Sequence, residues 1–362
     1  MLPYRSSFTL MPPASVCLLR LSALGDVTHA VPVVRTLQRE WPQTKITWII
    51  GKGEHGLVAD LPGVEFIPFD KRAGWPAFRD LRARLRGRRF DVLLLMQIAL
   101  RANLLSLFVR ANRRVGYDRQ RARELHGWFV NQRVPAPSVH PQHVVDAFGS
   151  FLQPLGLQQT EVHWGIPIPR EARAWAESAL PGAQPTLVIC PASSHPRRNW
   201  NTPGYAAVAT HAAQRRGFRI VLAGGRSELE RRLADEIRAC AQVPTIDLVG
   251  QTNLKQLLAL LTRATVVLAP DSGPMHVANA AGTPVIGLHA ATHLRRSGPY
   301  SDTRFCVDRF AEAVRLFRRK TPADLRWGER VEEAGVMDLI TSDEVIAAFE
   351  RFVASRSPLE PS

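Results

Sequence analysis

Cysteine is scarce in this sequence of 362 residues, which contains 4 of them: Cys17, Cys190, Cys240 and Cys306. No two have the spacing of a CxxC motif, so a disulfide scaffold and a cysteine-based zinc module are excluded. Cys17 and Cys190 lie within apolar runs and are predicted to be buried thiols. This usage is typical of a reducing compartment, and the sequence therefore predicts a cytoplasmic protein.

A long apolar segment is also lacking. The best candidate, Val92–Val109, is interrupted by Gln97, Arg101 and Asn103, so it is too polar to span a bilayer as a helix. Near the N-terminus, the pair Pro12-Pro13 stands where the apolar core of a signal peptide would have to form, and no such peptide is predicted. We expect a protein that is at most peripheral to a membrane.

Acidic residues are few relative to basic ones. Lys and Arg total 47 against 32 Asp and Glu, which gives a formal net charge of +15. The excess is concentrated in Lys71–Arg133, where 16 basic residues against 4 acidic ones leave +12. A protein this basic should associate with something anionic, such as nucleic acid, a membrane face or a phosphorylated substrate.

The length suggests two domains, and both halves alternate short apolar runs with helical patterns. Expected strands of the first half are Val16–Leu21, Ile46–Ile50, Val64–Phe69 and Val92–Met96, and expected helices are Val31–Glu40 and Trp75–Arg86. The pattern stops near Trp164–Pro169. It then restarts with strands Thr186–Cys190, Arg219–Leu222, Thr245–Leu248, Thr265–Ala269 and Pro284–Leu288, separated by helices. This alternation predicts two parallel sheets covered by helices, with ligands bound beyond the carboxyl ends of the strands.

A polar loop follows the first predicted strand and reads Leu21-Ser22-Ala23-Leu24-Gly25-Asp26-Val27-Thr28-His29. Gly25 permits a tight turn, and Asp26 then lies near the start of a helix. Two interpretations of Asp26 stay open. Its carboxylate either caps the helix or acts as a general base at the mouth of a cleft between the domains.

A second polar turn, Asp271-Ser272-Gly273-Pro274-Met275-His276, follows the strand Thr265–Ala269 and leads into a helix. The free N–H groups of a helix N-terminus form a site for an anion such as a diphosphate. A capped helix start is the alternative. The small polar residues, the glycine and a histidine one turn later make a richer pattern than one cap.

Two further loops follow strands of the second half. In the first, Arg197 and Arg198 stand close to the hydroxyl of Ser193 and suit phosphate oxygens, with a solvated basic loop as the alternative. In the second, Gly224-Gly225-Arg226-Ser227 leads to Glu228. Glu228 either binds a ribose hydroxyl or is a solvated acid that complements the helix dipole.

The segment Gly51-Lys52-Gly53-Glu54-His55-Gly56 matches GxGxxG after a predicted strand, which is the context of a dinucleotide site. It lies in the second β-α unit rather than the first, so NAD binding is kept only as an alternative. The sequence lacks a GxxxxGK P-loop, an Asp-x-Asp pair and an HExxH motif. A catalytic metal is therefore not expected.

Together these loops resemble the lipopolysaccharide heptosyltransferases, glycosyltransferase family 9. The resemblance runs from Val16 to about Arg351 and is carried best by the segments Leu19–Val27 and Asp271–Ala280. It implies an α/β fold of the GT-B type, with two doubly wound Rossmann-like domains facing an interdomain cleft. An acceptor-binding domain is expected over 1–170, an ADP-heptose-binding domain over 171–340, and a helix and tail that pack back on the first domain over 341–362.

The resemblance also implies inverting, metal-independent transfer of heptose from ADP-heptose to the Kdo region of lipopolysaccharide, with no cofactor beyond the donor. Asp26 then takes the proton of the acceptor hydroxyl. The diphosphate and heptose are assigned to Asp271, Ser272, Gly273 and His276.

Other donor contacts follow from the same resemblance. The family has a Lys before a Trp, and Arg198 stands at that position in Arg198-Asn199-Trp200. Arg keeps the charge in a planar fork, and Arg197 can share its role. Ser193 is placed beside the donor and Glu228 on its ribose.

For the acceptor, the resemblance indicates Ser22 and Gly25, with Lys71, Arg72 and Arg101 on nearby loops; plain surface charge is the alternative for the last three. The runs Ile67–Arg72 and Met96–Ala102 look like the branch that adds the first heptose to a single phosphorylated Kdo. A later heptosyltransferase of the core is the alternative within the family.

The implied partner is Kdo–lipid A at the inner face of the cytoplasmic membrane, whose negative charge matches the basic segment Lys71–Arg133. We therefore expect peripheral, salt-sensitive docking. Two alternatives belong to other classes: an NAD-dependent nucleotide-sugar enzyme that uses Gly51–Gly56, and a nucleic-acid binder. The basic segment lacks aromatics at a stacking spacing, so no nucleic-acid partner is expected.

Overall fold

The computed structural model describes residues 11–356, and its contacts divide the chain into two units. The first runs to Ser138 and includes Val144–Trp164, and the second comprises Val139–His143 and the chain from Gly165 onward. The division thus falls at Trp164, a few residues before the boundary expected at residue 170. The part of the signal-peptide argument that concerns residues 1–10 lies outside the described residues.

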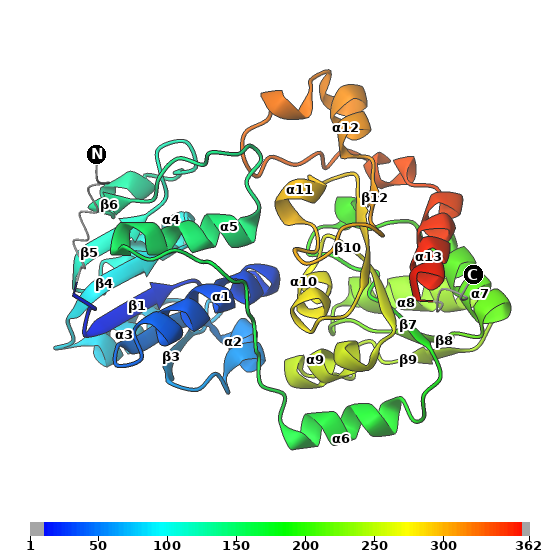
Figure 1. Ribbon diagram of the computed structural model, residues 1–362, viewed down its shortest axis with the longest axis horizontal. Coiled ribbons are helices and arrows are strands. Elements are labelled where there is room, and N and C mark those ends of the chain that lie inside the picture. Colours follow the sequence, from blue (N-terminus) through cyan, green and yellow to red (C-terminus); the bar gives the residue numbers. More distant parts are fainter. Residues whose placement is uncertain (1–10, 357–362) are drawn as a thin grey trace, which may run out of the picture. The chain divides into compact units, whose positions relative to one another are not determined.

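The first unit is built around one sheet with helices between its strands (Figure 1). Its strands are β1 (Ser15–Leu19), β2 (Lys45–Gly51), β3 (Val64–Phe69), β4 (Phe90–Leu95), β5 (Ala111–Gly116) and β6 (Gln132–Arg133). Its helices are α1 (Leu24–Glu40), α2 (Lys52–Val58), α3 (Trp75–Leu85), α4 (Leu100–Ser106), η1 (His126–Trp128), α5 (Val144–Gly149) and η2 (Ser150–Leu155).

The first sheet is parallel in every pairing and has the order β3-β2-β1-β4-β5-β6. Its central strand β1 is apolar along its length and buried on both faces, as parallel strands covered by helices are. Cys17 and Leu19 share one hydrophobic core with Leu81 of α3 and Leu105 of α4. The chain order reverses between β1 and β4, so the loops after these strands flank the switch point.

The second unit repeats this plan. Its strands are β7 (Thr186–Ile189), β8 (Arg219–Leu222), β9 (Thr245–Asp247), β10 (Val266–Pro270), β11 (Val285–His289) and β12 (Val307–Asp308). Its helices are α6 (Arg170–Ala179), η3 (Pro196–Arg198), α7 (Thr202–Arg216), α8 (Glu228–Cys240), α9 (Leu254–Arg263), α10 (Gly273–Ala280), α11 (Leu294–Ser297), α12 (Phe310–Ala313), η4 (Val314–Arg318), η5 (Pro322–Asp324), η6 (Val336–Leu339) and α13 (Ser342–Arg356).

The second sheet has the order β12-β11-β10-β7-β8-β9 and is again parallel. Its order reverses between β7 and β10, which are the strands that precede the Ser193–Arg198 and Asp271–His276 loops. The α/β fold with two doubly wound units is therefore confirmed. In each unit, the polar loops singled out from the sequence lie beside the switch point, where such sheets bind ligands.

Helix α1 begins earlier than expected. It spans Leu24–Glu40 and carries Pro32 in its interior, whereas the sequence suggested a start near Val31. Proline favours the first helical turn because its missing N–H is unpaired there, and this preference misled the prediction. Val27 and Val34 on either side of Pro32 are fully buried, so packing against the sheet outweighs the lost hydrogen bond.

Strand β5 was not predicted, because its sequence ANRRVG shows no apolar alternation. The structure explains the two arginines. Arg114 donates to the carbonyl oxygens of Phe129 and Val109 at 2.7 and 2.8 Å, and Arg113 donates to Pro154. Both side chains thus satisfy backbone acceptors inside the unit, which removes them from the surface charge that the Lys71–Arg133 count suggested.

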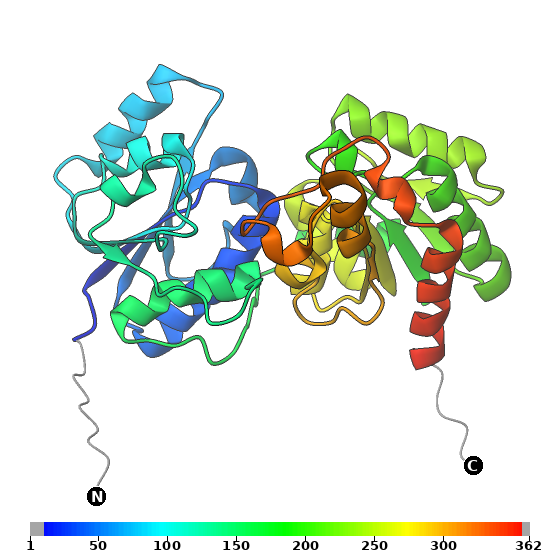
Figure 2. The ribbon, with the colours of Figure 1, turned by 90° about the horizontal axis from the view of Figure 1, so that it is seen from above.

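Helix α13 is present as predicted, but it belongs to the second unit. Phe349 and Phe352 are buried in that unit's core with Phe218 and Phe305, and Figure 2 shows α13 beside α7. The expected packing of the tail beyond Arg356 on the N-terminal domain lies outside the described residues. The aromatic face of the helix fits the hydrophobic core of the unit to which it is directly connected.

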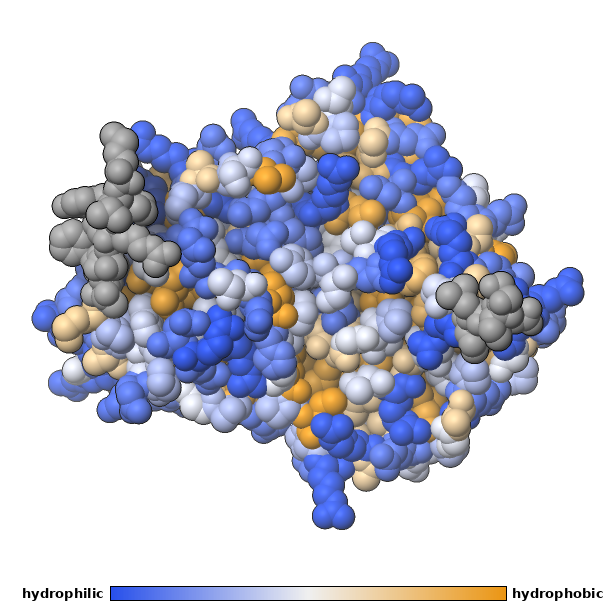
Figure 3. All heavy atoms as spheres, in the orientation of Figure 1, coloured by the Kyte–Doolittle hydropathy of each residue, from blue (hydrophilic) through white to orange (hydrophobic). Residues whose placement is uncertain are grey.

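Cys17 and Cys190 are buried as predicted, and burial raises the pKa of each thiol to about 12. None of the helices within residues 11–356 has the length and apolar character needed to cross a bilayer. Hydrophilic residues predominate on the face seen in Figure 3, and apolar residues form scattered patches there.

Candidate functional site

The loop after β1 carries a half-buried arginine, Arg20, that the sequence reasoning did not single out. Arg20 Nη1 donates to the carbonyl oxygen of Met96, after β4, at 2.6 Å. The next amide, of Leu21, donates to Gln97 Oε1 at 2.8 Å. The guanidinium also lies 5.2 Å from the centre of the Phe148 ring. The loops after β1 and β4 are therefore joined at the switch point of the first sheet.

Asp26 is held at this junction by Arg20. Its Oδ2 forms an ion pair with Arg20 Nη2 and accepts the Ala23 N–H at 3.2 Å. Asp26 is the third residue of α1 and therefore occupies the N3 position, while Ala23 is the N-cap residue. Its carboxylate caps the helix by accepting the backbone N–H of Ala23. Both contacts use Oδ2, and within residues 11–356 no hydrogen bond to Oδ1 is recorded. The side chain is 32% exposed, so Oδ1 is available to accept a proton.

The other residues assigned to the acceptor lie at the same edge of the first sheet. Ser22 and Gly25 belong to the loop and first turn that carry Asp26, and Arg101 is exposed on α4, which follows the neighbouring strand β4. Lys71 and Arg72 are exposed beyond β3, two strands from β1, or roughly 10 Å by the usual strand spacing. The structure thus groups Ser22, Gly25 and Arg101 near Asp26 and places the other two farther out.

The first glycine of the GxGxxG segment, Gly51, has a packing explanation. Gly51 ends β2, and its N–H donates to the carbonyl oxygen of Leu21 at 2.9 Å. A Cβ at Gly51 would lie 2.3 Å from that oxygen. Glycine is therefore required where β2 approaches the loop after β1, and no dinucleotide is needed to account for it.

In the second unit, the turn after β10 leads into α10, which begins at Gly273 after the N-cap Ser272. The Ser272 hydroxyl oxygen is buried without a hydrogen-bond partner among the described residues. The first N–H groups of an α-helix have no partner within the helix. The N-terminus of α10 therefore offers several donors, at a place where a buried anion would satisfy them.

Asp271 is fixed by two contacts from other elements. Its Oδ1 lies 3.2 Å from His276 Nε2 in α10, and its Oδ2 accepts the Ser297 hydroxyl of α11 at 2.8 Å. Burial alone would raise the pKa of Asp271. The hydrogen bond and charge of His276, the charge of His289 and the Ser297 hydroxyl outweigh it and hold this pKa well below its ordinary value. The carboxylate is thus ionised in the folded protein.

Further histidines surround this carboxylate. His289, the last residue of β11, is completely buried, and burial lowers its pKa against the opposing charge of Asp271. His143 also lies near Asp271; its Nε2 donates to the Gly298 carbonyl at 3.1 Å, and burial lowers its pKa to about 4. His289 and His293 are four residues apart and so have the HxxxH spacing of some metal sites. They do not share a helix, because α11 begins only at Leu294.

The two arginines in the loop after β7 differ in burial. Arg198 is 6% exposed, whereas Arg197 is exposed to solvent. Arg198 Nη2 donates to the Ser194 hydroxyl at 2.7 Å. Burial and the charge of Arg330 lower the pKa of Arg198, and the nearby charge of Asp271 opposes the shift. Arg198 is therefore the arginine that shares an electrostatic environment with the Asp271 turn.

Glu332 is a second residue that the sequence reasoning missed. Its Oε1 lies 3.3 Å from Arg198 Nε, 3.7 Å from Arg330 Nη1 and 3.9 Å from His195 Nδ1. The Glu332 carboxylate therefore lies among three basic side chains, a position that a phosphate oxygen of a ligand could also occupy. No local pattern marks it, because it lies more than a hundred residues beyond Arg198. Ser193 stands at the start of the same loop, with its N–H bonded to Asn199 Oδ1 at 2.7 Å.

Glu228 begins α8 and is exposed. The capping contacts of this helix come instead from Ser227 and Glu230, and Glu230 also accepts the Gly225 N–H at 2.5 Å. Glu228 lines a hollow of about 640 Å³ together with Gly225 and Gly250. Its carboxylate is thus left available to a ligand hydroxyl.

Metal ligands are not clustered in the part of the chain that the structure describes: within residues 11–356, no group of three or more His, Cys, Asp or Glu side chains could hold an ion.

Comparisons with known proteins give the family of the chain and structures with the same fold. The chain matches the model of glycosyltransferase family 9 (heptosyltransferase) over residues 78–324. It is 36% identical over 339 residues to the lipopolysaccharide core heptosyltransferase OpsX of Haemophilus influenzae, across 94% of this chain and 97% of that protein. It is 28% identical over 300 residues to lipopolysaccharide heptosyltransferase 1 of Pseudomonas aeruginosa, across 79% and 81%. The solved structure of E. coli heptosyltransferase WaaC with ADP aligns with a TM-score of 0.72 at 20% identity, across 93% of this chain and 99% of that chain.

Proposed function

The chain belongs to glycosyltransferase family 9, the heptosyltransferases, and we propose that it transfers heptose from ADP-heptose to the Kdo region of the lipopolysaccharide inner core. Transfer is proposed to invert the anomeric carbon in one displacement without a metal. The observation that carries the proposal is the pairing, at one switch point of the second sheet, of a buried arginine, Arg198, with the N-terminus of α10. This combination suits a diphosphate leaving group.

On the donor side, negative charge builds on the diphosphate as the bond to the anomeric carbon breaks. Arg198 and the N–H groups at Ser272 and Gly273 supply fixed positive charge and dipoles for that oxygen. Asp271 and His276 hold this turn in place through their mutual hydrogen bond. Glu228 is proposed to bind the ribose, and Ser193 and Arg197 complete the donor loop.

On the acceptor side, a sugar hydroxyl is a weak nucleophile until its proton is removed. Asp26 Oδ1 is proposed to take that proton while the hydroxyl oxygen bonds to the anomeric carbon and ADP departs. Arg20 holds the opposite oxygen of the same carboxylate and so orients Oδ1. Ser22, Gly25 and Arg101 are proposed to contact the anionic acceptor, with Lys71 and Arg72 at its periphery.

We further propose that the acceptor carries a single phosphorylated Kdo, and that the enzyme works in the cytoplasm at the inner face of the inner membrane. The choice of this branch is supported by the runs Ile67–Arg72 and Met96–Ala102, while the OpsX relative, 36% identical over nearly its whole length, supports a core heptosyltransferase. A later heptosyltransferase of the core remains the second candidate, because the chain also aligns with lipopolysaccharide heptosyltransferases 2 and 3 of Escherichia coli.

The test is direct transfer. Purified protein is given ADP-heptose and phosphorylated Kdo–lipid A, and mass spectrometry follows the addition of one heptose, with and without EDTA. Nuclear magnetic resonance of the product then gives the anomeric configuration. Transfer only to an already heptosylated core would support the second candidate, and loss of activity on metal removal would contradict the metal-free step.

A further inference from the structure

Helix α4 exposes a row of leucines. Leu100, Leu104 and Leu107 are 44%, 43% and 62% exposed, and their spacing of four and three residues places them on one face. Ala102 and Leu105 on the other face are fully buried in the core of the first unit. A short helix with leucine on its solvent side as well as its core side is uncommon on a soluble surface and marks an interaction.

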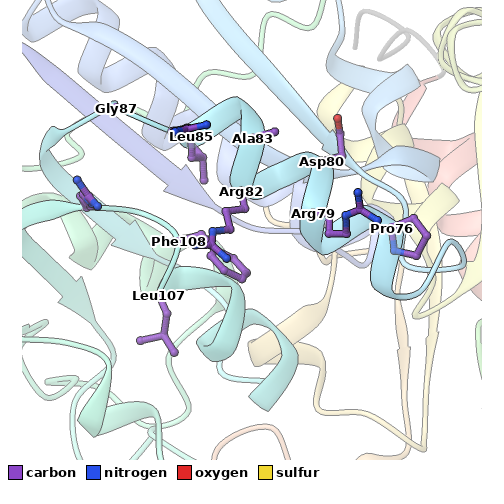
Figure 4. Close-up of a pocket in the computed structure, with 11 residues that line it drawn as sticks. Pro76, Arg79, Asp80, Arg82, Ala83, Leu85, Gly87, Leu107 and Phe108 are labelled. Carbon is purple, nitrogen blue, oxygen red and sulfur yellow. The ribbon is translucent and has the colours of Figure 1, made fainter.

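Helix α3 carries a matching row of arginines. Arg79 and Arg82 are exposed one helical turn apart, and the exposed Arg86 follows directly as the C-cap residue. Together with Arg110, Leu107 and Phe108 they line a hollow of about 1180 Å³ between α3 and the end of α4, shown in Figure 4. We call this hollow the α3–α4 groove. Arg86, Gly87 and Arg110 place one end of it at the turns that follow α3 and α4.

The positive charge of the groove is not compensated inside the unit. In the part of the chain that the structure describes, none of the four groove arginines has an ion pair or side-chain hydrogen bond. Their neighbours differ: Arg84 pairs with Asp80 at 2.9 Å, and Arg88 with Glu65 at 2.6 Å. Asp80, the acid that lines the groove, is therefore already engaged by an arginine outside it.

Aromatic side chains continue the apolar flank. Trp75 is 73% exposed and stacks on Phe78, with ring centres 5.8 Å apart. Phe78 in turn meets Phe108 edge-on at 6.5 Å. The free guanidinium groups of the groove are thus flanked by an exposed tryptophan and by the leucine row of α4. This surface places aliphatic and aromatic side chains beside the guanidinium groups, a combination that suits the interfacial region of a bilayer.

We propose that the α3–α4 groove and the leucine row dock the first unit on a bilayer of anionic phospholipid. The arginines bind headgroup phosphates, while Leu104, Leu107 and Trp75 enter the interfacial region. This rests on the proposed function in one respect: a glycolipid acceptor gives the enzyme a reason to bind a membrane. The ligand of the groove is nevertheless the phospholipid, and the sugar acceptor is not required for docking.

The test uses the full-length protein and sedimentation with vesicles. Vesicles are phosphatidylcholine alone or mixed with phosphatidylglycerol, at low and high salt. The wild type is expected to bind only the mixed vesicles, and less at high salt. The quadruple variant Arg79→Gln/Arg82→Gln/Arg86→Gln/Arg110→Gln is expected to bind at least about tenfold more weakly. A charge-matched control, Arg170→Gln/Arg215→Gln/Lys320→Gln/Arg351→Gln, removes exposed charges of the second unit and should lose less than about twofold.

A second variant, Leu104→Ser/Leu107→Ser, tests the apolar part and is expected to weaken binding at both salt concentrations. Equal losses in the arginine variant and its control would overturn the proposal, as would wild-type binding by both groove variants. Binding by the wild type that requires the phosphorylated glycolipid acceptor, with none to phosphatidylglycerol, would also overturn it. Transfer to a deacylated, water-soluble acceptor should be unchanged in both groove variants, so failure of the heptosyl-transfer proposal is seen separately from failure of docking.

Discussion

Oδ1 of Asp271 lies 3.2 Å from Nε2 of His276, one turn further along the chain. Because Ser297 binds the other carboxylate oxygen at 2.8 Å, the turn after β10 is tied both to its own helix and to α11. The same carboxylate therefore stabilises the second unit and shapes the proposed donor site. Substitutions at this position are expected to have two separable effects.

Asp271→Asn is expected to lower the free energy of unfolding of the second unit at pH 7 by about 2–4 kcal/mol, because it replaces a buried, hydrogen-bonded charge. The pKa of Asp271 is lowered in the folded state. Its stabilisation is therefore complete above the ordinary carboxyl pKa of about 4 and is lost as pH falls below that value. The variant should lose less stability than the wild type below pH 4. Hydrogen exchange of the β10 and β11 amides measures this for the second unit alone.

The effect of Asp271 on the donor is tested with Asp271→Ala. Because the Ser272 turn and His276 lose their anchor, ADP affinity measured by calorimetry at pH 7 is expected to fall about tenfold or more. Thermal unfolding establishes the temperature at which the variant is still folded. Unchanged ADP affinity in a folded variant would remove Asp271 from the donor site.

Asp26→Asn is expected to lower kcat by about 10² to 10⁴, because the amide cannot take the proton of the acceptor hydroxyl. ADP affinity should be unchanged, since the proposed donor contacts lie in the second unit. Steady-state transfer and ADP calorimetry on the same preparation give both values. Asp343→Asn, at an exposed position of α13, is the matched control, and normal turnover by Asp26→Asn would rule it out as the base.

Arg198→Ala is expected to weaken ADP binding by about 10- to 100-fold, whereas Arg197→Ala should change it by less than about threefold. The reason is burial: Arg198 is 6% exposed and Arg197 faces solvent. Arg198→Lys should recover part of the affinity, because it keeps the charge without the planar fork. Equal losses in the two alanine variants would show that both arginines bind the diphosphate.

The first unit is expected to lose stability between about pH 6.5 and pH 4. His126 is buried with its Nδ1 beside Asn103 Oδ1 at 2.9 Å, and its Nε2 accepts the Tyr117 N–H at 3.1 Å. Burial lowers the pKa of His126 to about 4, so only the unfolded chain takes up the proton in this range. The loss amounts to about 3 kcal/mol by linkage.

His126→Gln should flatten this pH dependence for the first unit while lowering its stability at pH 7. Urea unfolding monitored by hydrogen exchange of the β4 and β5 amides measures the pH dependence and the stability of the first unit at pH 7. The exposed His163 provides the control His163→Gln, which should leave the slope unchanged. A slope equally steep in His126→Gln and the wild type would show that another group is responsible.

Much of the fold followed from local patterns. The predicted strands Val64–Phe69 and Arg219–Leu222 match β3 and β8 residue for residue, because apolar β-rich runs between turn residues need no distant partner to be recognised. Strand β5 was missed because its arginines are satisfied by distant carbonyl groups. Helix α13 was found, but its position was not, because amphipathicity shows that a face is buried and not which core it enters.

The sequence by itself determined the order of the elements and the chemistry of the loops, since the alternation of strand and helix is local and the carboxyl ends of parallel strands share one edge. Only the tertiary structure decided which partners those loops meet. Ser297 binding Asp271 and Glu332 facing Arg198 join residues that are far apart along the chain. The ion pair of Arg20 with Asp26 joins two residues of one segment whose contact depends on the folded loop. The tertiary structure also divided the basic segment into arginines that serve the unit's interior, such as Arg114, and arginines left free in the α3–α4 groove. A residue count cannot make that division, because the environment of each charge is set by contacts distant in sequence.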